Sequence, residues 1–185
     1  SATGAQLPVR HMALNLGAPG DRRDSAGTVW LAYPRPNPKK VTSLDLAFDL
    51  HPKFDKGGFT SVSAATQPVA GTSTPWLYTS WASGLRELTV PLRGADDRPA
   101  TYELTLHFAQ IREGTARFDV EINGRVVLSD LELARDADSQ PQAQIRAVAG
   151  IEVDRNLTLR LIPKGTETAK ARAVLNALEI REKTN

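Results

Sequence analysis

Apolar and polar residues alternate along much of the chain, and the clearest case is TYELTLHFAQIREGTARFDVEING at residues 101–124. Its first apolar set recurs at every second position: Tyr102, Leu104, Leu106 and Phe108. A period of two places these side chains on one face of a β-strand and the residues between them on the other. Asn123-Gly124 then supplies two residues suited to positive φ, which predicts a type I′ hairpin turn. We therefore expect a hairpin with one face in the core.

Similar short runs recur along the sequence, and turn residues separate nearly all of them. They read HMALNL, TVWLAY, SLDLAFDL, GFTSVSAA, WLYTSWAS, RELTVPL, IRAVAGIEV, NLTLRLI and AVLNALEI. No window of about a dozen residues carries a helical stripe. Many short strands with frequent turns predict an all-β fold, an antiparallel β-sandwich of jelly-roll type.

The domain organisation follows from length and composition. A chain of 185 residues with 41% hydrophobic content suits one compact domain. The small and polar residues of 1–10 predict a linker or a segment left by expression, and 11–182 a single β-sandwich domain. Two segments rich in Pro, Gly, Ser and Thr, PRPNPKK at 34–40 and ATQPVAGTSTPW at 65–76, predict loops at an end of the sandwich, where binding residues collect.

Charge and rare residues exclude several function classes. A net charge of +2 arises from 23 basic and 21 acidic residues spread along the chain, which argues against nucleic acid and membrane-surface partners. No apolar run is long enough for membrane insertion. Cysteine is absent, and His11, His51 and His107 lack metal-ligand spacing, so we expect no metal site and no cofactor. His107 falls on the polar face of its strand and is expected to be half-exposed.

The richest acidic segment is SDLELARDADS at 129–139. Two of its carboxylates could in principle serve glycoside hydrolysis, and a calcium loop is another possibility, although the glycine and glutamate of an EF-hand loop are missing. We favour a solvated strand edge and turn over both, and expect that the domain is not an enzyme. Asp136 is kept as a candidate sugar-binding acid.

Aromatic residues flank the two predicted loops. Trp30 and Tyr33 precede the first, and Trp76, Tyr78 and Trp81 follow the second. An aromatic ring offers a flat apolar face to a sugar, but the same residues are ordinary sandwich core, and we favour the core for Trp30 and Trp76. Alternation along WLYTSW puts Tyr78 and Trp81 on opposite faces, so one of them should be reachable from solvent.

Residues 102–180 resemble the malectin and malectin-like carbohydrate-binding domains. The resemblance rests on YELTLHFAQI, ARFDVEINGRVVLSDLEL, NLTLRLIPKG and VLNALEI, and more loosely on LNLGAP, GTVWLAYP and WLYTSW upstream. It implies a lectin-like sandwich whose sugar pocket is made by loop aromatics and an acidic residue. By this resemblance Tyr33, Tyr78 and Asp136 fall near the family's ligand-binding positions, with Trp30 and Trp81 as neighbours.

The resemblance implies a non-catalytic carbohydrate-binding module of a larger secreted, periplasmic or cell-envelope protein. Its expected partners are an oligosaccharide or polysaccharide and the other domains of the parent chain. The chain departs from the family at REGTA, residues 112–116, where malectin places an aromatic pair. This departure keeps an alternative open, a structural or protein-interaction module that has lost the sugar site.

Overall fold

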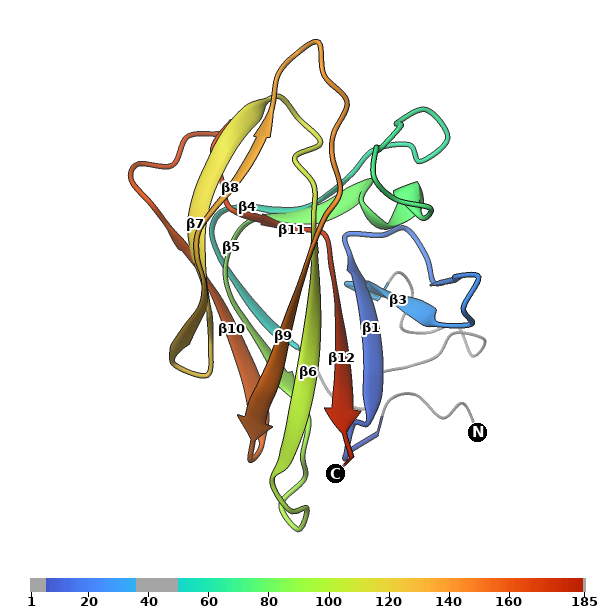
Figure 1. Cartoon of the computed structure of the whole chain (residues 1–185), viewed down its shortest axis with the longest axis vertical. Coiled ribbons are helices and arrows are strands. Elements are labelled where there is room, and N and C mark those ends of the chain that lie inside the picture. Colours follow the sequence, from blue (N-terminus) through green and yellow to red (C-terminus); the bar gives the residue numbers. More distant parts are fainter. Residues whose placement is uncertain (1–5, 36–49, 185) are drawn as a thin grey trace.

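The computed structural model of the chain describes residues 6–35 and 50–184 (Figure 1). One short 3-10 helix, η1, spans Pro75–Leu77. The strands are β1 His11–Leu16, β2 Arg22–Arg23, β3 Val29–Tyr33, β4 His51–Ser61, β5 Ser80–Pro91, β6 Ala100–Phe108, β7 Gly114–Ile122, β8 Arg125–Arg135, β9 Gln144–Val153, β10 Asn156–Pro163, β11 Val174–Leu175 and β12 Ala177–Lys183. All but the last residue of the expected strand SLDLAFDL lies outside the described residues.

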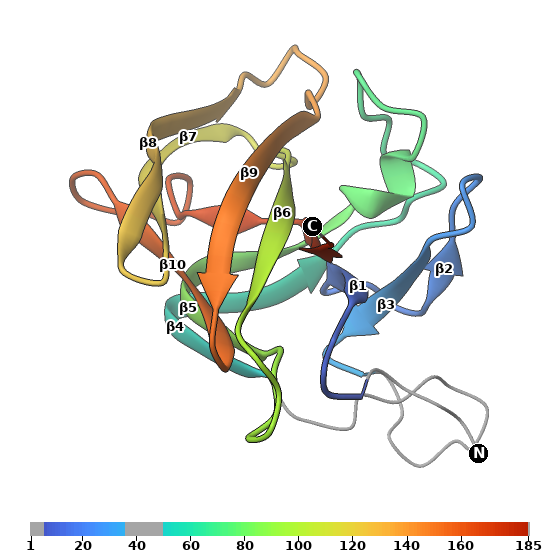
Figure 2. The same ribbon diagram turned by 60° about the horizontal axis from the view of Figure 1, so that its bottom comes forward.

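The strands form two sheets that stack as layers, as Figures 1 and 2 show. The first sheet has the order β2-β3-β1-β12-β6-β9, and the second has the order β11-β5-β10-β7-β8 with β4 also paired to β5. Among the strands named above, every pairing is antiparallel except that of β1 with β3. The predicted antiparallel β-sandwich is confirmed.

The main core lies between the sheets and follows the alternation in the sequence. The apolar set of β6, from Tyr102 to Phe108, is fully buried. Phe118 of β7 faces it from the second sheet, with its ring 5.9 Å from that of Phe108. The predicted hairpin is also confirmed, because Asn123 and Gly124 have φ of 48° and 83° between β7 and β8.

A second cluster of packed residues covers part of the outer face of the first sheet. His107 lies in register with Ala177, which lies in register with Asn15, so these side chains share that face. Trp30 and Tyr78 pack edge-on against the His107 ring, with centroids 5.3 and 5.8 Å away. The expectation of a half-exposed His107 was wrong, because these two rings bury it.

The segment before β5 differs from the expected strand at 76–83. Pro75 starts η1, and the N–H of Tyr78 bonds to the Pro75 carbonyl, so the extended backbone begins only at Ser80. The strict alternation assumed for WLYTSW therefore does not hold. Tyr78 and Trp81 are both buried, and the expectation that one of them is reachable was wrong.

Asn176 ties the two sheets together at the point where the chain passes from β11 to β12. Its fully buried side chain donates from Nδ2 to the carbonyls of Tyr78 and Ser80 and accepts the N–H of Ala109. Three backbone groups thus gain a buried side-chain partner.

Packing begins before the first strand. Val9 is buried, its N–H donates to the carbonyl of Leu92, and its own carbonyl accepts from the Tyr102 hydroxyl at 2.6 Å. Val9 was assigned to the predicted linker, yet it belongs to the packed part of the chain.

Candidate functional site

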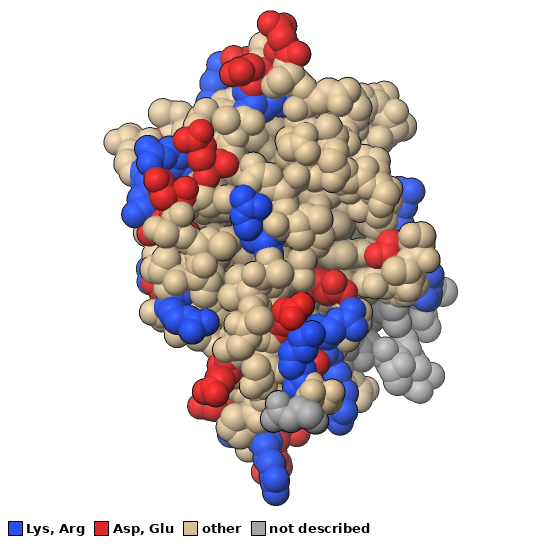
Figure 3. All heavy atoms as spheres, viewed as in Figure 1, with Lys and Arg blue, Asp and Glu red and all other residues tan. Residues whose placement is uncertain are grey.

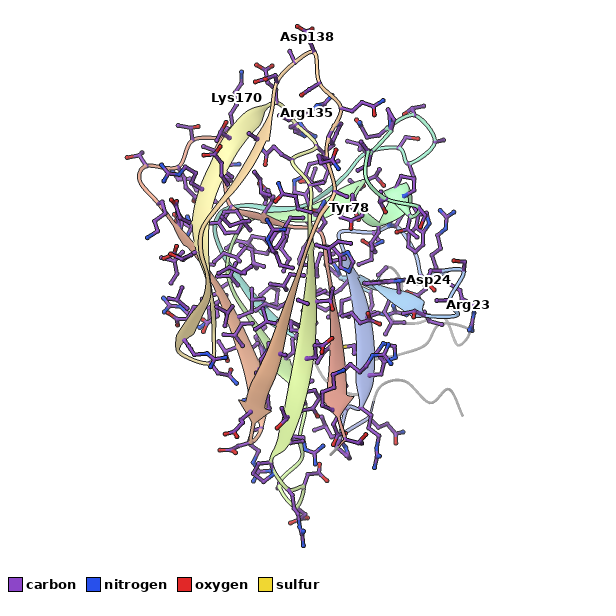
Figure 4. All side chains as sticks on the ribbon, viewed as in Figure 1. Arg23, Asp24, Tyr78, Arg135, Asp138 and Lys170 are labelled. Atoms are coloured by element: carbon purple, nitrogen blue, oxygen red, sulfur yellow. The ribbon has the colours of Figure 1, made fainter. Side chains whose placement is uncertain are left out.

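The five sequence-predicted sugar residues do not form an open aromatic platform. Four of them are nearly or fully buried, with exposed fractions of 4% for Trp30, 8% for Tyr33, 0% for Tyr78 and 5% for Trp81. Asp136 is exposed in the turn after β8, where its N–H donates to the Ser139 hydroxyl. Figure 4 places Asp138 at the outer tip of this loop and Tyr78 inside the molecule.

Hydrogen bonds hold three of these aromatic residues as parts of the scaffold. The indole N–H of Trp30 donates to Asp24 at 3.1 Å, and the Tyr33 hydroxyl donates to the Leu50 carbonyl at 3.0 Å. The Tyr78 hydroxyl lies 2.8 Å from Nδ1 of His107. Burial raises the pKa of Tyr78 to about 12 and lowers the pKa of His107 to about 4. His107 is therefore neutral near pH 7, and its Nδ1 can accept a hydrogen bond from the Tyr78 hydroxyl.

The acidic segment forms ion pairs. Arg117 donates to both carboxylate oxygens of Asp130 and lies 3.8 Å from Glu132. These pairs are exposed and account for two of the carboxylates that motivated the hydrolase alternative. Among residues 6–35 and 50–184, no group of three or more His, Asp or Glu side chains is placed to hold a metal ion.

Two adjoining hollows form a groove beside Trp81. The smaller, of about 40 Å³, is lined by Trp81, Ser83, Ala109, Gln110, Ile111, Arg112, Ala169, Arg172 and Val174. The larger, of about 450 Å³, is lined by Asp55, Lys56, Arg86, Pro163, Gly165, Thr166, Glu167, Thr168, Ala169 and Arg172. Because Ala169 and Arg172 line both, we treat the hollows as one feature, the cationic groove.

Two glycines let the chain segments around the groove approach closely. Gly84 of β5 has a φ of +72°, and a Cβ there would lie 1.8 Å from the Lys56 carbonyl oxygen. A Cβ on Gly114 would lie 1.9 Å from the Lys170 carbonyl oxygen. Only glycine fits at these contacts. They bring β4 against β5, and the loop between β10 and β11 against the start of β7.

The groove carries more positive than negative charge. Its basic residues are Lys56, Arg86, Arg112 and Arg172, and its acidic residues are Asp55 and Glu167, a balance of +2. Arg86 pairs with Glu167 and Asp55, and its buried Nη1 has no described partner. Arg112 and Arg172 form no ion pair or hydrogen bond with any described residue. No carboxylate among the described residues therefore neutralises these two guanidinium groups, and both can bind an anion.

Two further groups give the groove polarity and an aromatic wall. The Arg112 guanidinium lies 5.8 Å from the centre of the Trp81 ring. Gln110 is buried, and its side-chain carbonyl oxygen has no hydrogen-bond partner in the described part of the chain. A buried acceptor without a donor is costly, so a ligand hydroxyl would be favoured there.

Two residues of this groove were singled out by the sequence. Trp81 was a candidate, and Arg112 belongs to the segment REGTA that departs from the resembling family. Gln110 and Arg172 gave no local signal, because they meet only through packing between segments distant in sequence. On the face that Figure 3 shows, Lys and Arg intermingle with Asp and Glu, so overall charge gave no signal either.

Comparison with known proteins places the fold but not the family. No family model matches the sequence. No curated protein matches it either.

Solved structures with the same fold include an enzyme and plant receptors. A β-glucuronidase of Bacteroides uniformis matches with a TM-score of 0.66 at 16% identity, over 94% of this chain and 18% of the enzyme. The ANX2 ectodomain from Arabidopsis thaliana matches with a TM-score of 0.61 at 17% identity, over 95% of this chain and 42% of that chain. FER, in a crystal structure of the plant peptide RALF23 with FER and LLG2, matches with a TM-score of 0.62 at 17% identity. The match covers 92% of this chain and 48% of that chain.

At these identities the likeness concerns the fold alone. The chain spans about a fifth of the enzyme and about half or less of the two receptor chains. The same sandwich thus occurs as one part of longer proteins of different kinds. No helix among the described residues is long and apolar enough to cross a membrane.

Proposed function

We propose that the domain is a non-catalytic carbohydrate-binding module that recognises an acidic glycan in the cationic groove. The observation that carries the proposal is the pair of unpaired guanidinium groups, Arg112 and Arg172, lining a groove with the Trp81 ring and the unpartnered Gln110 oxygen. A neutral glycan would leave both charges without a partner. An acidic glycan would pair with them.

Binding would combine charge and hydroxyl recognition. A guanidinium presents parallel N–H donors that match a carboxylate or sulfate. A neighbouring sugar hydroxyl would donate to Gln110. Arg112 is exposed, so its guanidinium can turn from the Trp81 ring towards the anion. The groove is open to solvent, which suits the weak binding typical of modules that keep a larger protein near a polysaccharide.

The test is titration with acidic and neutral oligosaccharides of equal length. Tetragalacturonate supplies carboxylates, sulfated maltotetraose supplies sulfates, and maltotetraose is the neutral probe. We expect saturable binding of one acidic probe, weakened about tenfold by Arg112→Ala or Arg172→Ala, since a hydrogen bond to a charged group contributes about 1.5 kcal/mol or more.

Matched controls remove a positive charge outside the groove. Arg98→Ala changes an exposed arginine between β5 and β6, and Lys170→Ala changes a lysine close to Arg172 that does not line the groove. Both should bind the acidic probe within about twofold of the wild type. No saturable binding of either acidic probe, or equal losses in the controls, contradicts the proposal.

A protein-interaction module is the second candidate function. Four aromatic residues that the resemblance to malectin-like domains places at the sugar pocket are buried, which favours this candidate: Trp30, Tyr33, Tyr78 and Trp81. An acidic peptide would then bind the same unpaired arginines more tightly than any glycan. Titration with tetraglutamate beside tetragalacturonate separates the two candidates.

We propose that the domain acts without chemistry, as part of a longer secreted, periplasmic or envelope protein. Absence of reducing-sugar release from polygalacturonate and starch by the purified domain is the expected result. Release that survives further purification would contradict it.

A further inference from the structure

A separate hollow lies at the edge of the first sheet, outside the cationic groove. It has a volume of about 430 Å³, and its lining includes Asn15, Asp21, Arg22, Ser63, Ala64 and Trp76. It lies between the segment that links β1 to β2 and the segment that links β4 to η1, which run on the same side of the molecule in Figures 1 and 2. We name it the tryptophan hollow.

Asn15 directs an unused polar group to this hollow. The residue is only 3% exposed, and its Oδ1 accepts a hydrogen bond from the Ser80 hydroxyl at 3.1 Å. Its Nδ2 donates to no described residue, although Asn15 lines the hollow. A nine-tenths buried amide with one atom bonded and one unused is a ready partner for a ligand oxygen.

Trp76 supplies an apolar wall. It is half-buried, unlike Trp30 and Trp81, and the Arg22 guanidinium lies 4.6 Å from the centre of its ring. This contact fixes the ring from one side. An indole that is held in place and partly exposed offers the flat surface on which the C–H face of a pyranose packs.

The tryptophan hollow differs from the cationic groove in charge, because one acidic side chain, Asp21, and one basic side chain, Arg22, line the hollow. Partial burial alone would raise the pKa of Asp21, but hydrogen bonds from Arg35 and from the Ala32 N–H outweigh burial and lower it. Asp21 is therefore an anion, and its carboxylate pairs with Arg35. The lining offers donors at Asn15 and Arg22 and acceptors at Asp21 and Ser63, a mixture that suits hydroxyl groups.

We propose that the tryptophan hollow is a second ligand site, which binds an uncharged sugar unit. The pyranose ring packs on Trp76, and one of its oxygens accepts from the Asn15 amide. The site is independent of the acidic-glycan site, because no residue lines both.

The experiment uses maltotetraose, cellotetraose and mannotetraose with the full chain. We expect at least one of these neutral probes to bind and to change the tryptophan fluorescence, and Trp76→Ala to weaken it about tenfold. Ala64→Arg fills the hollow from an exposed position and should abolish binding. Ala65→Arg, at the neighbouring exposed residue that does not line the hollow, should bind normally.

Two results overturn this inference. One is the absence of binding by all three neutral probes. The other is neutral-probe binding that Ala64→Arg leaves unchanged. Because Ala64 is exposed, this variant still tests the hollow if Trp76→Ala does not fold. Repeating the titrations in Arg172→Ala separates the two sites, since that variant should lose the acidic probe and keep the neutral one.

Discussion

Residues of one short segment line both the cationic groove and the tryptophan hollow, yet the two features differ in charge and in the ligand proposed for each. Thr79 lines the hollow, and Trp81, two residues later, lines the groove. The groove has a balance of +2, whereas the hollow has one charge of each sign. The scaffold thus determines where the loops meet, while the side chains at each meeting point determine its charge and polarity.

The largest expected effect removes the support that both regions share. Asn176→Ala leaves the Tyr78 and Ser80 carbonyls and the Ala109 N–H without partners in the interior. We expect a loss of about 4 kcal/mol in the free energy of unfolding, since each buried unpaired group costs about 1–3 kcal/mol. Urea denaturation measures it.

Asn156→Ala is the control for this variant, because Asn156 is exposed and its side chain forms no described hydrogen bond. It should change the free energy of unfolding by less than about 0.5 kcal/mol. Equal losses in the two variants would show that Asn176 does not join the sheets.

A somewhat smaller effect concerns His107, which Trp30 and Tyr78 bury on the outer face of the first sheet. The pKa of His107 is about 4 in the folded state against 6.5 for an ordinary histidine. The unfolded state therefore binds the proton first as the pH falls, and stability is lost between pH 6.5 and about 4. The loss amounts to at most about 3 kcal/mol.

Denaturation of the wild type and His107→Gln at pH 7.5 and pH 5 checks this expectation. The wild type should be less stable at the lower pH, and the glutamine variant should lose the part of the slope that His107 causes. A variant with the wild-type slope would assign the pH dependence to other groups.

A third and smaller effect separates the regions by charge alone. Raising the salt concentration from about 0.02 M to about 0.5 M shortens the screening length from about 20 Å to about 4 Å. Affinity for the acidic probe should fall several-fold, while affinity for a neutral probe should change by less than about twofold. Equal salt dependence of the two probes would remove the distinction between the sites.

The sequence predicted the scaffold well and the sites in part. The hairpin around Asn123 and the core stripe of β6 follow from local rules, a period of two and a turn that needs positive φ. The exposure of Tyr78 and Trp81 did not follow, because Pro75 replaces the start of a strand with a 3-10 turn and the loop folds onto His107.

The two hollows also show what local patterns omit. Trp76 was expected in the core, and it packs against the core while remaining half-exposed over the hollow. Arg112 and Arg172 lie sixty residues apart in sequence, and their segments meet where Gly114 closely approaches the Lys170 backbone. The predicted role of Asp136 in sugar binding stays a prediction.

Amide chemical-shift mapping of the domain with tetragalacturonate and with sulfated maltotetraose tests directly whether the cationic groove binds an acidic glycan. We expect saturable shifts at Gln110–Arg112 and at Ala169–Arg172, with little change around Asn123 at the β7–β8 turn. Saturable shifts confined to other surfaces, or no shifts with either acidic probe at millimolar concentration, would contradict it.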